Sequence, residues 1–250
     1  MSAKRYLITG ASSGLGAAFA RRISAQGGEV WGLARREGLL KELAASLPKG
    51  SFRFSVCDTG DPLQVKAAWE TMRQAGFLPD VAILNAGINI HDLTPQFDHA
   101  AFRKQYETNL FGATQWVDLL LPGFLQRGSG HFVAISSMSA YLRANHGAGY
   151  ASSKAAMSMA FGCLEARYGK DGIGFTTVNL GPTQTAMWPG GKFPLLMSAE
   201  SAAAKILKAV EKKKSVLDLP CLLVLLARLT QFIPQGLLSA LVSLVKPKKK

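Results

Sequence analysis

Cysteine is scarce and scattered in this chain. Its 250 residues include three cysteines, Cys57, Cys163 and Cys221, which form no CxxC pair and no cluster with histidine. Disulfide frameworks and structural zinc sites both need such groupings, so we expect neither a disulfide nor a bound metal. Free thiols are typical of a reducing compartment, which predicts a cytoplasmic protein.

We also expect neither a secretory leader nor a nucleic-acid-binding motif. Residues 1–5 are mostly polar, and the apolar run after them is too short for a signal-peptide core. The formal net charge of +13 is high, but no RNA-recognition, zinc-finger or helix-turn-helix signature accompanies it. Part of the excess lies in two lysine clusters, at 212–214 and 246–250. We therefore expect no nucleic-acid partner.

The chain does contain a regular alternation of short apolar runs and longer helical patterns. Predicted strands cover 5–9, 29–34, 51–56, 81–85, 130–136 and 174–180. Predicted helices cover 14–25, 36–46, 62–74, 100–126 and 148–168. Nearly continuous apolar strands are typical of a parallel sheet that is buried on both faces. The pattern predicts an α/β fold: a doubly wound, Rossmann-type parallel sheet with helices on both faces.

This fold predicts a ligand loop where the first strand meets the first helix. Residues 9–16 at that point read TGASSGLG. Gly10 can make the tight turn, while Gly14 and Gly16 allow close approach of the backbone to a pyrophosphate and of the helix to the strand. The helix N-terminus would then offer free N–H groups to phosphate. Taken alone, the stretch could equally be a plain Gly/Ser turn.

Further motifs follow in order along the chain. They are Asp58 after the third strand, Asn85-Ala86-Gly87 after the fourth, Asn109 in ETNLFG, Ser137 in AISSMSAY, and Tyr150 and Lys154 in YASSK. With the T-G-x-x-x-G-x-G loop, these motifs make residues 4 to about 190 resemble the classical short-chain dehydrogenase/reductase family. Each motif alone has a structural explanation, such as a turn, a cap, a core amide or a surface pair.

The resemblance implies an oxidoreductase site and a nicotinamide cofactor. The implied catalytic residues are Asn109, Ser137, Tyr150 and Lys154. The implied cofactor-binding residues are Gly10, Ser12, Ser13, Gly14, Leu15, Gly16, Arg35, Asp58, Asn85, Ala86, Gly87, Tyr150, Lys154, Gly181, Thr183 and Thr185. The family also implies that Lys154 binds ribose, that Asn109 holds a water of a proton relay, and that two copies pair as a homodimer.

The spacing of Tyr150 and Lys154 suggests how the chemistry would work. Residues four apart on a helix share a face. A nearby ammonium favours the phenolate, so we expect the pKa of the Tyr150 phenol to be lowered, with help from the positive nicotinamide ring. The phenol could then act as general acid or base, and Ser137 could hydrogen-bond the substrate oxygen.

The end of the second predicted strand indicates the cofactor. It reads EVWGLARRE, so Ala34 and Arg35 stand where an NAD enzyme places an acidic residue, and no acid occurs before Glu37. A guanidinium suits a 2′-phosphate by charge and geometry, which predicts NADP(H). The alternative is that Arg35 and Arg36 are simply solvated at a helix start.

The substrate side of the site is less defined by sequence. The family commonly has Pro-Gly after the sixth strand, whereas here Gly181 precedes Pro182. Residues 186–197 resemble a substrate lid, with Trp188, Phe193, Leu195 and Leu196 as apolar lining. Leu142 and Arg143 are expected to border the substrate, and His146 is a further polar candidate. We therefore expect a small apolar ketone, aldehyde or alcohol as substrate.

The C-terminal part is apolar and basic. We divide the chain into a catalytic domain, 1–200, which includes the lid, and an apolar helical extension, 201–250, with a lysine-rich end. Residues 219–245 carry one charge, Arg228, and Pro220 and Pro234 break the run. The pieces are too short to span a bilayer, so we expect peripheral membrane contact through 219–250. Covering the protein's own pocket and packing on a partner subunit are the alternatives, and the final lysines could also form a dilysine retention signal.

Two functions are therefore weighed. The first is an NADP(H)-dependent short-chain oxidoreductase that interconverts a carbonyl and an alcohol. The second is a non-catalytic protein of the same fold, either nucleotide-sensing or membrane-associated. The presence of Asn109, Ser137, Tyr150 and Lys154 together favours the first, because a binding module does not need that set.

Overall fold

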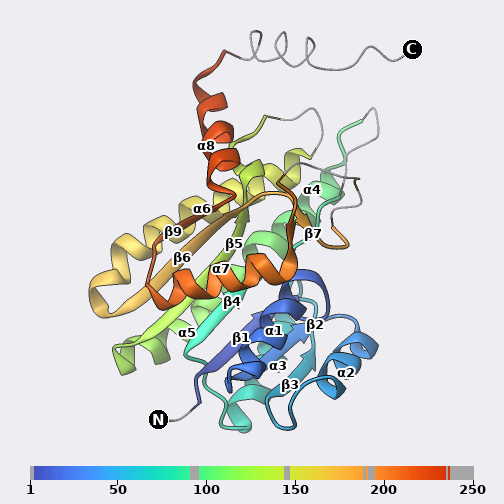
Figure 1. The fold of residues 1–250 in the computed structure, drawn as a ribbon, viewed down its shortest axis with the longest axis vertical. Coiled ribbons are helices and arrows are strands. Elements are labelled where there is room, and N and C mark those ends of the chain that lie inside the picture. The colour runs from blue at the N-terminus through green and yellow to red at the C-terminus, as the bar shows by residue number, and fades with distance from the viewer. Residues whose placement is uncertain are drawn as a thin grey trace.

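The computed structural model describes residues 3–90, 96–143, 147–187, 190, 195–234 and 236. A parallel sheet of seven strands forms the centre, in the order β3-β2-β1-β4-β5-β6-β9 (Figure 1). Its strands are β1 Arg5–Thr9, β2 Glu29–Ala34, β3 Phe52–Val56, β4 Val81–Leu84, β5 Gly130–Ser137, β6 Ile173–Leu180 and β9 Val216–Leu219. A separate parallel pair joins β7 Thr183–Gln184 to β8 Met197–Ser198.

Helices cover both faces of the sheet. The α-helices are α1 Gly14–Ala25, α2 Glu37–Ala45, α3 Pro62–Gln74, α4 His99–Tyr106, α5 Gly112–Arg127, α6 Ala148–Tyr168, α7 Ala199–Glu211 and α8 Cys221–Leu229. Short turns of other types are the π-helix η1 Glu107–Phe111 and the 3-10 helices η2 Met138–Tyr141, η3 Gly169–Asp171 and η4 Thr230–Phe232.

Two apolar cores follow from the alternation of side chains along each strand. In β1, Ile8 belongs to the core under α1, α2 and α7, whereas Leu7 belongs to the core under α3, α5 and α6. Each core therefore covers one face of the sheet, and the strands are apolar on both faces as the sequence predicted. The doubly wound, Rossmann-type fold and the single-domain architecture are confirmed.

The order of the strands predicts where a ligand cleft should lie. The chain proceeds outward from β1 to β3 on one side and from β4 to β9 on the other, so the order reverses between β1 and β4. Ligands of doubly wound sheets bind beyond the carboxyl ends of the strands at such a switch point. The glycine-rich loop follows β1, and Asn85 follows β4, at this position.

Six predicted strands are confirmed, with ends that shift by at most a residue or so. The predicted helix 100–126 is confirmed as an unbroken helical run from His99 to Arg127, but it contains one turn of π-helix, η1, between α4 and α5. The wider turn brings Gly112 against the Thr59 carbonyl, where a Cβ would overlap backbone. π-turns inside helices often accompany functional sites, and this one carries Asn109.

The chain after residue 200 contains a strand as well as helices. Residues 201–250 were predicted to be a helical extension, but they include strand β9, which pairs with β6 at the edge of the sheet. Helix α7 packs against α1, so residues 199–219 belong to the same layered fold. The strand was missed because it has four residues and includes the charged Asp218. Among the described residues, no helix is both long enough and apolar enough to cross a bilayer.

Candidate active site

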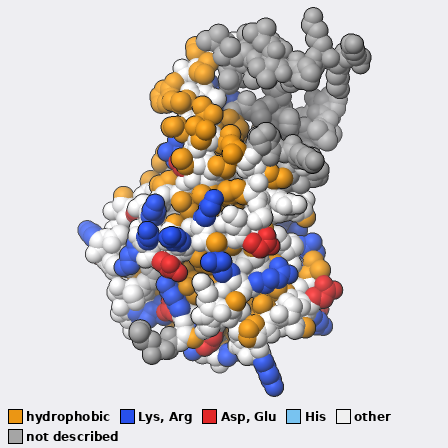
Figure 2. All heavy atoms as spheres, in the orientation of Figure 1, with side chains coloured by type: hydrophobic (Ala, Val, Ile, Leu, Met, Phe, Trp, Pro, Cys, Tyr) orange, Lys and Arg blue, Asp and Glu red, His pale blue; other side chains and the backbone are white. Residues whose placement is uncertain are grey.

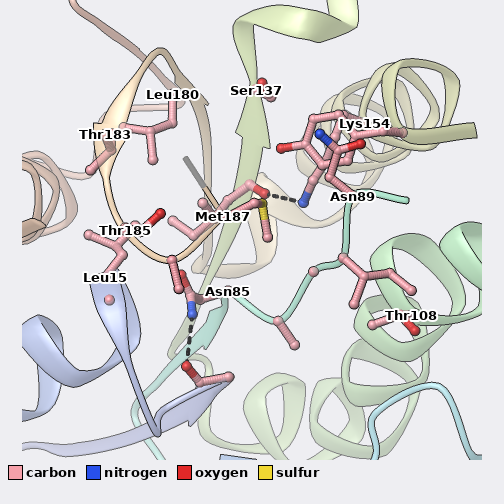
Figure 3. Close-up of a pocket in the computed structure, with 18 of the residues that line it drawn as sticks. Leu15, Asn85, Asn89, Thr108, Ser137, Lys154, Leu180, Thr183, Thr185 and Met187 are labelled. Atoms are coloured by element: carbon pink, nitrogen blue, oxygen red, sulfur yellow. Dashed lines mark hydrogen bonds between the residues drawn. The ribbon is translucent and has the colours of Figure 1, made fainter. Parts of the chain in front are cut away.

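A cleft of about 990 Å³ opens at the switch point. Its wall brings together segments that are far apart in sequence: the loop after β1, the ends of β2 to β6, and the start of α6. In Figure 3, Leu15, Asn85, Ser137, Lys154 and Thr185 converge on this space from five different segments. The predicted site residues that line it are Gly10, Ser12, Ser13, Gly14, Leu15, Arg35, Asp58, Asn85, Ala86, Gly87, Ser137, Tyr150, Lys154, Gly181, Thr183 and Thr185.

The glycine-rich loop has the conformation that the sequence predicted. Gly10 and Gly14 have φ values of 68° and 53°, in the left-handed region that favours glycine. Gly16 does not line the cleft; a Cβ there would overlap the Gly10 carbonyl, so its role is close packing of α1 on the loop. Ser13 caps α1 without a side-chain hydrogen bond, and the first turn contains no acidic residue. The N–H groups of that turn therefore suit phosphate.

Asn85 ties the loop to the neighbouring strand. Its Nδ2 donates to the Thr9 carbonyl at 3.0 Å and to the Gly10 carbonyl at 3.3 Å. The backbone N–H groups of Asn85 and Ala86 both donate to Thr9 Oγ1. These bonds fix the Asn-Ala-Gly turn against the glycine loop. Together, the glycine backbone of the loop and the N–H groups at the start of α1 fit the diphosphate of a dinucleotide.

Cations gather at the end of β2. Arg36 Nη2 donates to Ser13 Oγ at 2.6 Å and to Ser12 Oγ at 3.3 Å, so this side chain reaches across the loop. Arg35 Nη1 lies 3.9 Å from Asp58 Oδ2, and Lys104 Nζ lies 3.7 Å from the same oxygen. The sequence predicted Arg35 as the cofactor residue, and Arg36 was not predicted. The Arg-Arg pair in ARRE indicates positive charge at the end of β2. The sequence does not show which of the two side chains turns toward the glycine-rich loop.

Ser137, Tyr150 and Lys154 come from the end of β5 and the first turns of α6. Lys154 is 3% exposed, and its Nζ donates to the Ile135 carbonyl at 2.7 Å. Burial lowers the pKa of Lys154 to about 8. The Lys154 ammonium lies 5.9 Å from the centre of the Tyr150 ring. The helical spacing therefore does place both groups on the same wall, as predicted.

The expected lowering of the Tyr150 pKa was wrong for the chain alone. Burial raises the pKa of the Tyr150 phenol above its ordinary value, and a hydrogen bond with Ser137 opposes this effect only in part. The phenol is therefore held protonated at neutral pH. The sequence could show the nearby ammonium but not how much the surrounding protein desolvates the hydroxyl.

Asn109 is fully buried and does not line the cleft. Its Oδ1 accepts from the Ile88 N–H at 2.7 Å, and its Nδ2 donates to the Ile88 carbonyl and to Ser153 Oγ, both at 3.0 Å. Gln105 makes a similar bond, accepting from the Ile90 N–H at 3.1 Å. Both amides hold the segment after the Asn-Ala-Gly turn.

Asn89 lies in the segment that these two amides hold. Its side chain lines the cleft, and its buried Oδ1 has no hydrogen-bond partner among the described residues. Figure 3 shows Asn89 close to the Lys154 side of the cleft. Asn89 was not predicted as a site residue, because nothing in the sequence distinguishes it from an ordinary loop asparagine.

The remaining wall is mainly apolar. Side chains of Ile88, Ile90, Met138, Leu142 and Met187 line it, so Leu142 lies where the sequence placed it. Arg143 and Leu195 are exposed and do not line the cleft, and neither does Leu196. The predicted lid residues Trp188 and Phe193, and His146, lie outside the described residues.

The shifted proline does not displace the loop after β6 from the site. Gly181 N–H donates to the Leu219 carbonyl at 2.6 Å, and Met197 N–H donates to the Pro182 carbonyl at 3.2 Å. These bonds anchor the loop to β9 and β8, and Thr183 and Thr185 still face the cleft.

Comparison with known proteins agrees with this geometry. The family model for short chain dehydrogenases matches residues 4–191. The chain belongs to the short-chain dehydrogenase family. Its resemblance to that family is thereby confirmed, and with it an oxidoreductase fold that uses nicotinamide cofactors.

Several proteins of the short-chain dehydrogenase family are similar to this chain in sequence or in structure. Fatty acyl-CoA reductase of Acinetobacter baylyi is 32% identical over 216 residues, which cover 83% of this chain and 72% of that protein. Dehydrogenase/reductase SDR family member 7B of Bos taurus is 33% identical, over 83% of this chain and 70% of that one. A short-chain dehydrogenase from Streptomyces avermitilis superposes with a TM-score of 0.82 at 26% identity, over 98% of this chain and 99% of that chain.

Proposed function

We propose that this short-chain dehydrogenase is an NADP(H)-dependent enzyme that interconverts an apolar ketone or aldehyde with its alcohol. The observation that carries the proposal is the meeting of Ser137, Tyr150 and Lys154 with the glycine-rich loop on one cleft. A protein that only sensed a nucleotide would need the loop but not a buried lysine beside a phenol.

The chain's own residues account for the proton transfer. When bound, the nicotinamide cofactor supplies or accepts the hydride. In carbonyl reduction, the Tyr150 hydroxyl donates its proton to the oxygen that becomes the alcohol, and Ser137 stabilises the same oxygen by a hydrogen bond. The raised pKa of Tyr150 keeps this proton in place until it is needed. The Lys154 ammonium then stabilises the phenolate.

Asn109 would act as a positioning residue. Its three hydrogen bonds hold Ile88, in the segment after the Asn-Ala-Gly turn, and Ser153, the residue before Lys154. A Cβ at Gly87 would lie 3.3 Å from Asn109 Oδ1 and 3.4 Å from Lys154 Nζ, so the two side chains border the same small space. That proximity supports the water-holding role that the family implies.

The preference for NADP(H) is supported by charge at the end of β2. Arg35 and Arg36 both line the cleft there, and no carboxylate occupies the strand end where NAD enzymes bind the ribose 2′-hydroxyl. Asp58 partly neutralises Arg35 across 3.9 Å, which leaves Arg36 as the freer guanidinium for a 2′-phosphate.

An apolar substrate is supported by the lining of the cleft and by one relative. Met138, Leu142 and Met187 offer few polar groups to a substrate. The Acinetobacter relative is named for a fatty acyl substrate.

Assembly and location complete the proposal. We propose a homodimer through the helices that carry Asn109 and Tyr150, where Phe111 and Met159 are exposed. We also propose a cytoplasmic protein with peripheral membrane contact through residues 219–250.

A panel of apolar ketones and aldehydes, offered with NADPH and with NADH, tests the function. Oxidation of NADPH is followed at its absorbance band. We expect turnover of some medium-chain or long-chain carbonyls, with a higher kcat/KM for NADPH than for NADH. NADPH binding without turnover of any carbonyl, and without oxidation of any alcohol by NADP, would instead favour a sensing role.

A further inference from the structure

We infer that helix α8 with η4 forms a docking surface for an anionic lipid bilayer. We call this surface the α8 apolar face; it consists of Leu222, Leu225, Leu226, Leu229 and Phe232. The four leucines are 49–58% exposed, and Phe232 is 84% exposed. Their spacing of three and four residues puts the leucines on one side of the helix. The inference deepens the membrane contact proposed above and does not depend on hydride chemistry.

The opposite side of α8 is fastened to the protein. Val224 and Ala227 are buried. Arg228 Nη2 donates to Asp218 Oδ1 at 3.0 Å, and its guanidinium lies 5.0 Å from the centre of the Tyr141 ring. Thr230 Oγ1 lies within 3.4 Å of the Tyr141 carbonyl. These contacts with β9 and η2 fix the rotation of α8, so its leucines point away from the body of the molecule.

Charge on the same face matches anionic headgroups. Figure 2 shows apolar side chains gathered over α8 and Lys and Arg side chains below them on this face. Exposed lysines on and after α7 are Lys205, Lys208, Lys212, Lys213 and Lys214, against the acidic Glu200 and Glu211. Neither α8 nor η4 contains an acidic residue. Lysines on the same face of the molecule as exposed leucines are typical of surfaces that bind anionic membranes.

The sequence after α8 is also apolar and ends in lysines. Residues 237–245 are uncharged and mostly apolar, and lysines follow at 246 and 248–250. The nine residues of α8 would extend only about 14 Å, less than half of the bilayer core of about 30 Å. The α8 apolar face is therefore suited to lie in the interface rather than to cross it.

A second copy of the chain is a poorer occupant of this face. An isologous contact through α8 would bring two equally basic surfaces together, in a chain of formal net charge +13. An anionic bilayer instead covers the leucines and neutralises the lysines at the same time.

Docking would also orient the cleft. Helix α8 packs against η2, whose Met138 and Ser139 line the cleft. The substrate end of the cleft would then lie beside the lipid, so a carbonyl compound dissolved in the bilayer is the expected class of substrate. This second consequence rests on the proposed function.

Vesicle flotation with the full-length protein tests the docking surface. Vesicles of phosphatidylcholine are compared with vesicles that also contain phosphatidylglycerol. We expect binding to the anionic vesicles, weakened by added salt, and a loss of at least roughly tenfold in affinity for the double variant Leu225→Ser/Leu229→Ser. The matched control is Leu63→Ser, because Leu63 is 79% exposed on α3 and does not belong to this face.

The outcomes separate the possible occupants. NADPH binding and circular dichroism confirm that each variant is folded. Equal flotation of the double variant and the wild type would overturn the inference. Absence of binding of the wild type to anionic vesicles would also overturn it. If the double variant then dissociated from an oligomer that the wild type forms, α8 would face a second copy of the chain. Loss of turnover of a vesicle-borne ketone, with turnover of a short water-dissolved ketone retained, would support the orienting role. If neither ketone is turned over, the proposed function fails while flotation still decides the docking.

Discussion

Replacing Lys154 by methionine should stabilise the cofactor-free protein, although it removes a residue of the proposed active site. Lys154 is 3% exposed, and burial lowers its pKa from 10.5 to about 8. That difference corresponds to about 3 kcal/mol of unfavourable free energy for the buried ammonium. Methionine has a similar shape without the charge. It leaves the Ile135 carbonyl without its donor, which costs about 1 kcal/mol.

The pH dependence gives the direction of the effect. The folded protein releases the Lys154 proton at about pH 8, whereas the unfolded chain keeps it up to about pH 10.5. The unfolded state thus binds more protons in this window, so the contribution of Lys154 to stability improves as the pH rises through it. The penalty is fully present at pH 7. The free energy of unfolding of the Lys154→Met variant should therefore exceed that of the wild type by about 2 kcal/mol at pH 7. This difference should disappear near pH 10.5.

Thermal unfolding of the cofactor-free protein at pH 7 and at pH 10 measures this difference. The expected rise in Tm at pH 7 is about 4–8 °C for a chain of this size. Lys170→Met is the matched control, because Lys170 is exposed in η3, just after the end of α6. A Lys154→Met variant that is less stable than the wild type by the same amount at both pH values would refute the reasoning.

Three further predictions concern other parts of the site. Arg36→Ala should raise the KM for NADPH by roughly tenfold to a hundredfold and leave the KM for NADH nearly unchanged, in steady-state assays with both cofactors; equal effects on both would exclude Arg36 as the 2′-phosphate residue. Gly16→Ala should lower the free energy of unfolding by about 2 kcal/mol, because its Cβ meets the Gly10 carbonyl, and an unchanged denaturant midpoint would contradict the close packing. Asn109→Leu should cost about 3 kcal/mol of stability and lower kcat more than it raises KM, since both polar groups of Ile88 lose their partner; a normal kcat in the folded variant would rule out the positioning role.

The sheet could be predicted because its signal is local. Apolar runs such as 5–9 and 130–136 are long enough to identify strands, and helices with regular spacing separate them. β9 gave no such signal: it is short, and Asp218 is accommodated only because Asn179 and Arg228 bond it from other elements. The π-turn at Asn109 was equally hidden, since residues 107–111 continue the helical pattern of the segments before and after them.

The sequence motifs predicted where the site lies, but they did not predict the pKa shifts of its groups. Spacing on a helix placed Tyr150 beside Lys154 without any structure. Desolvation depends on everything that surrounds a group, and here it raises the pKa of Tyr150 where the sequence alone predicted a decrease. The reach of Arg36 to Ser13, and the burial of Asn89 Oδ1 without a partner among the described residues, likewise depend on side-chain directions at loop positions.

The central claim is that the Tyr150 hydroxyl transfers the proton in the reaction. Its most direct test is the Tyr150→Phe variant in single-turnover assays with NADPH and a carbonyl that the wild type reduces. We predict that NADPH binds with nearly unchanged Kd while the rate of reduction falls at least a hundredfold. Reduction by the variant at the wild-type rate would contradict the account.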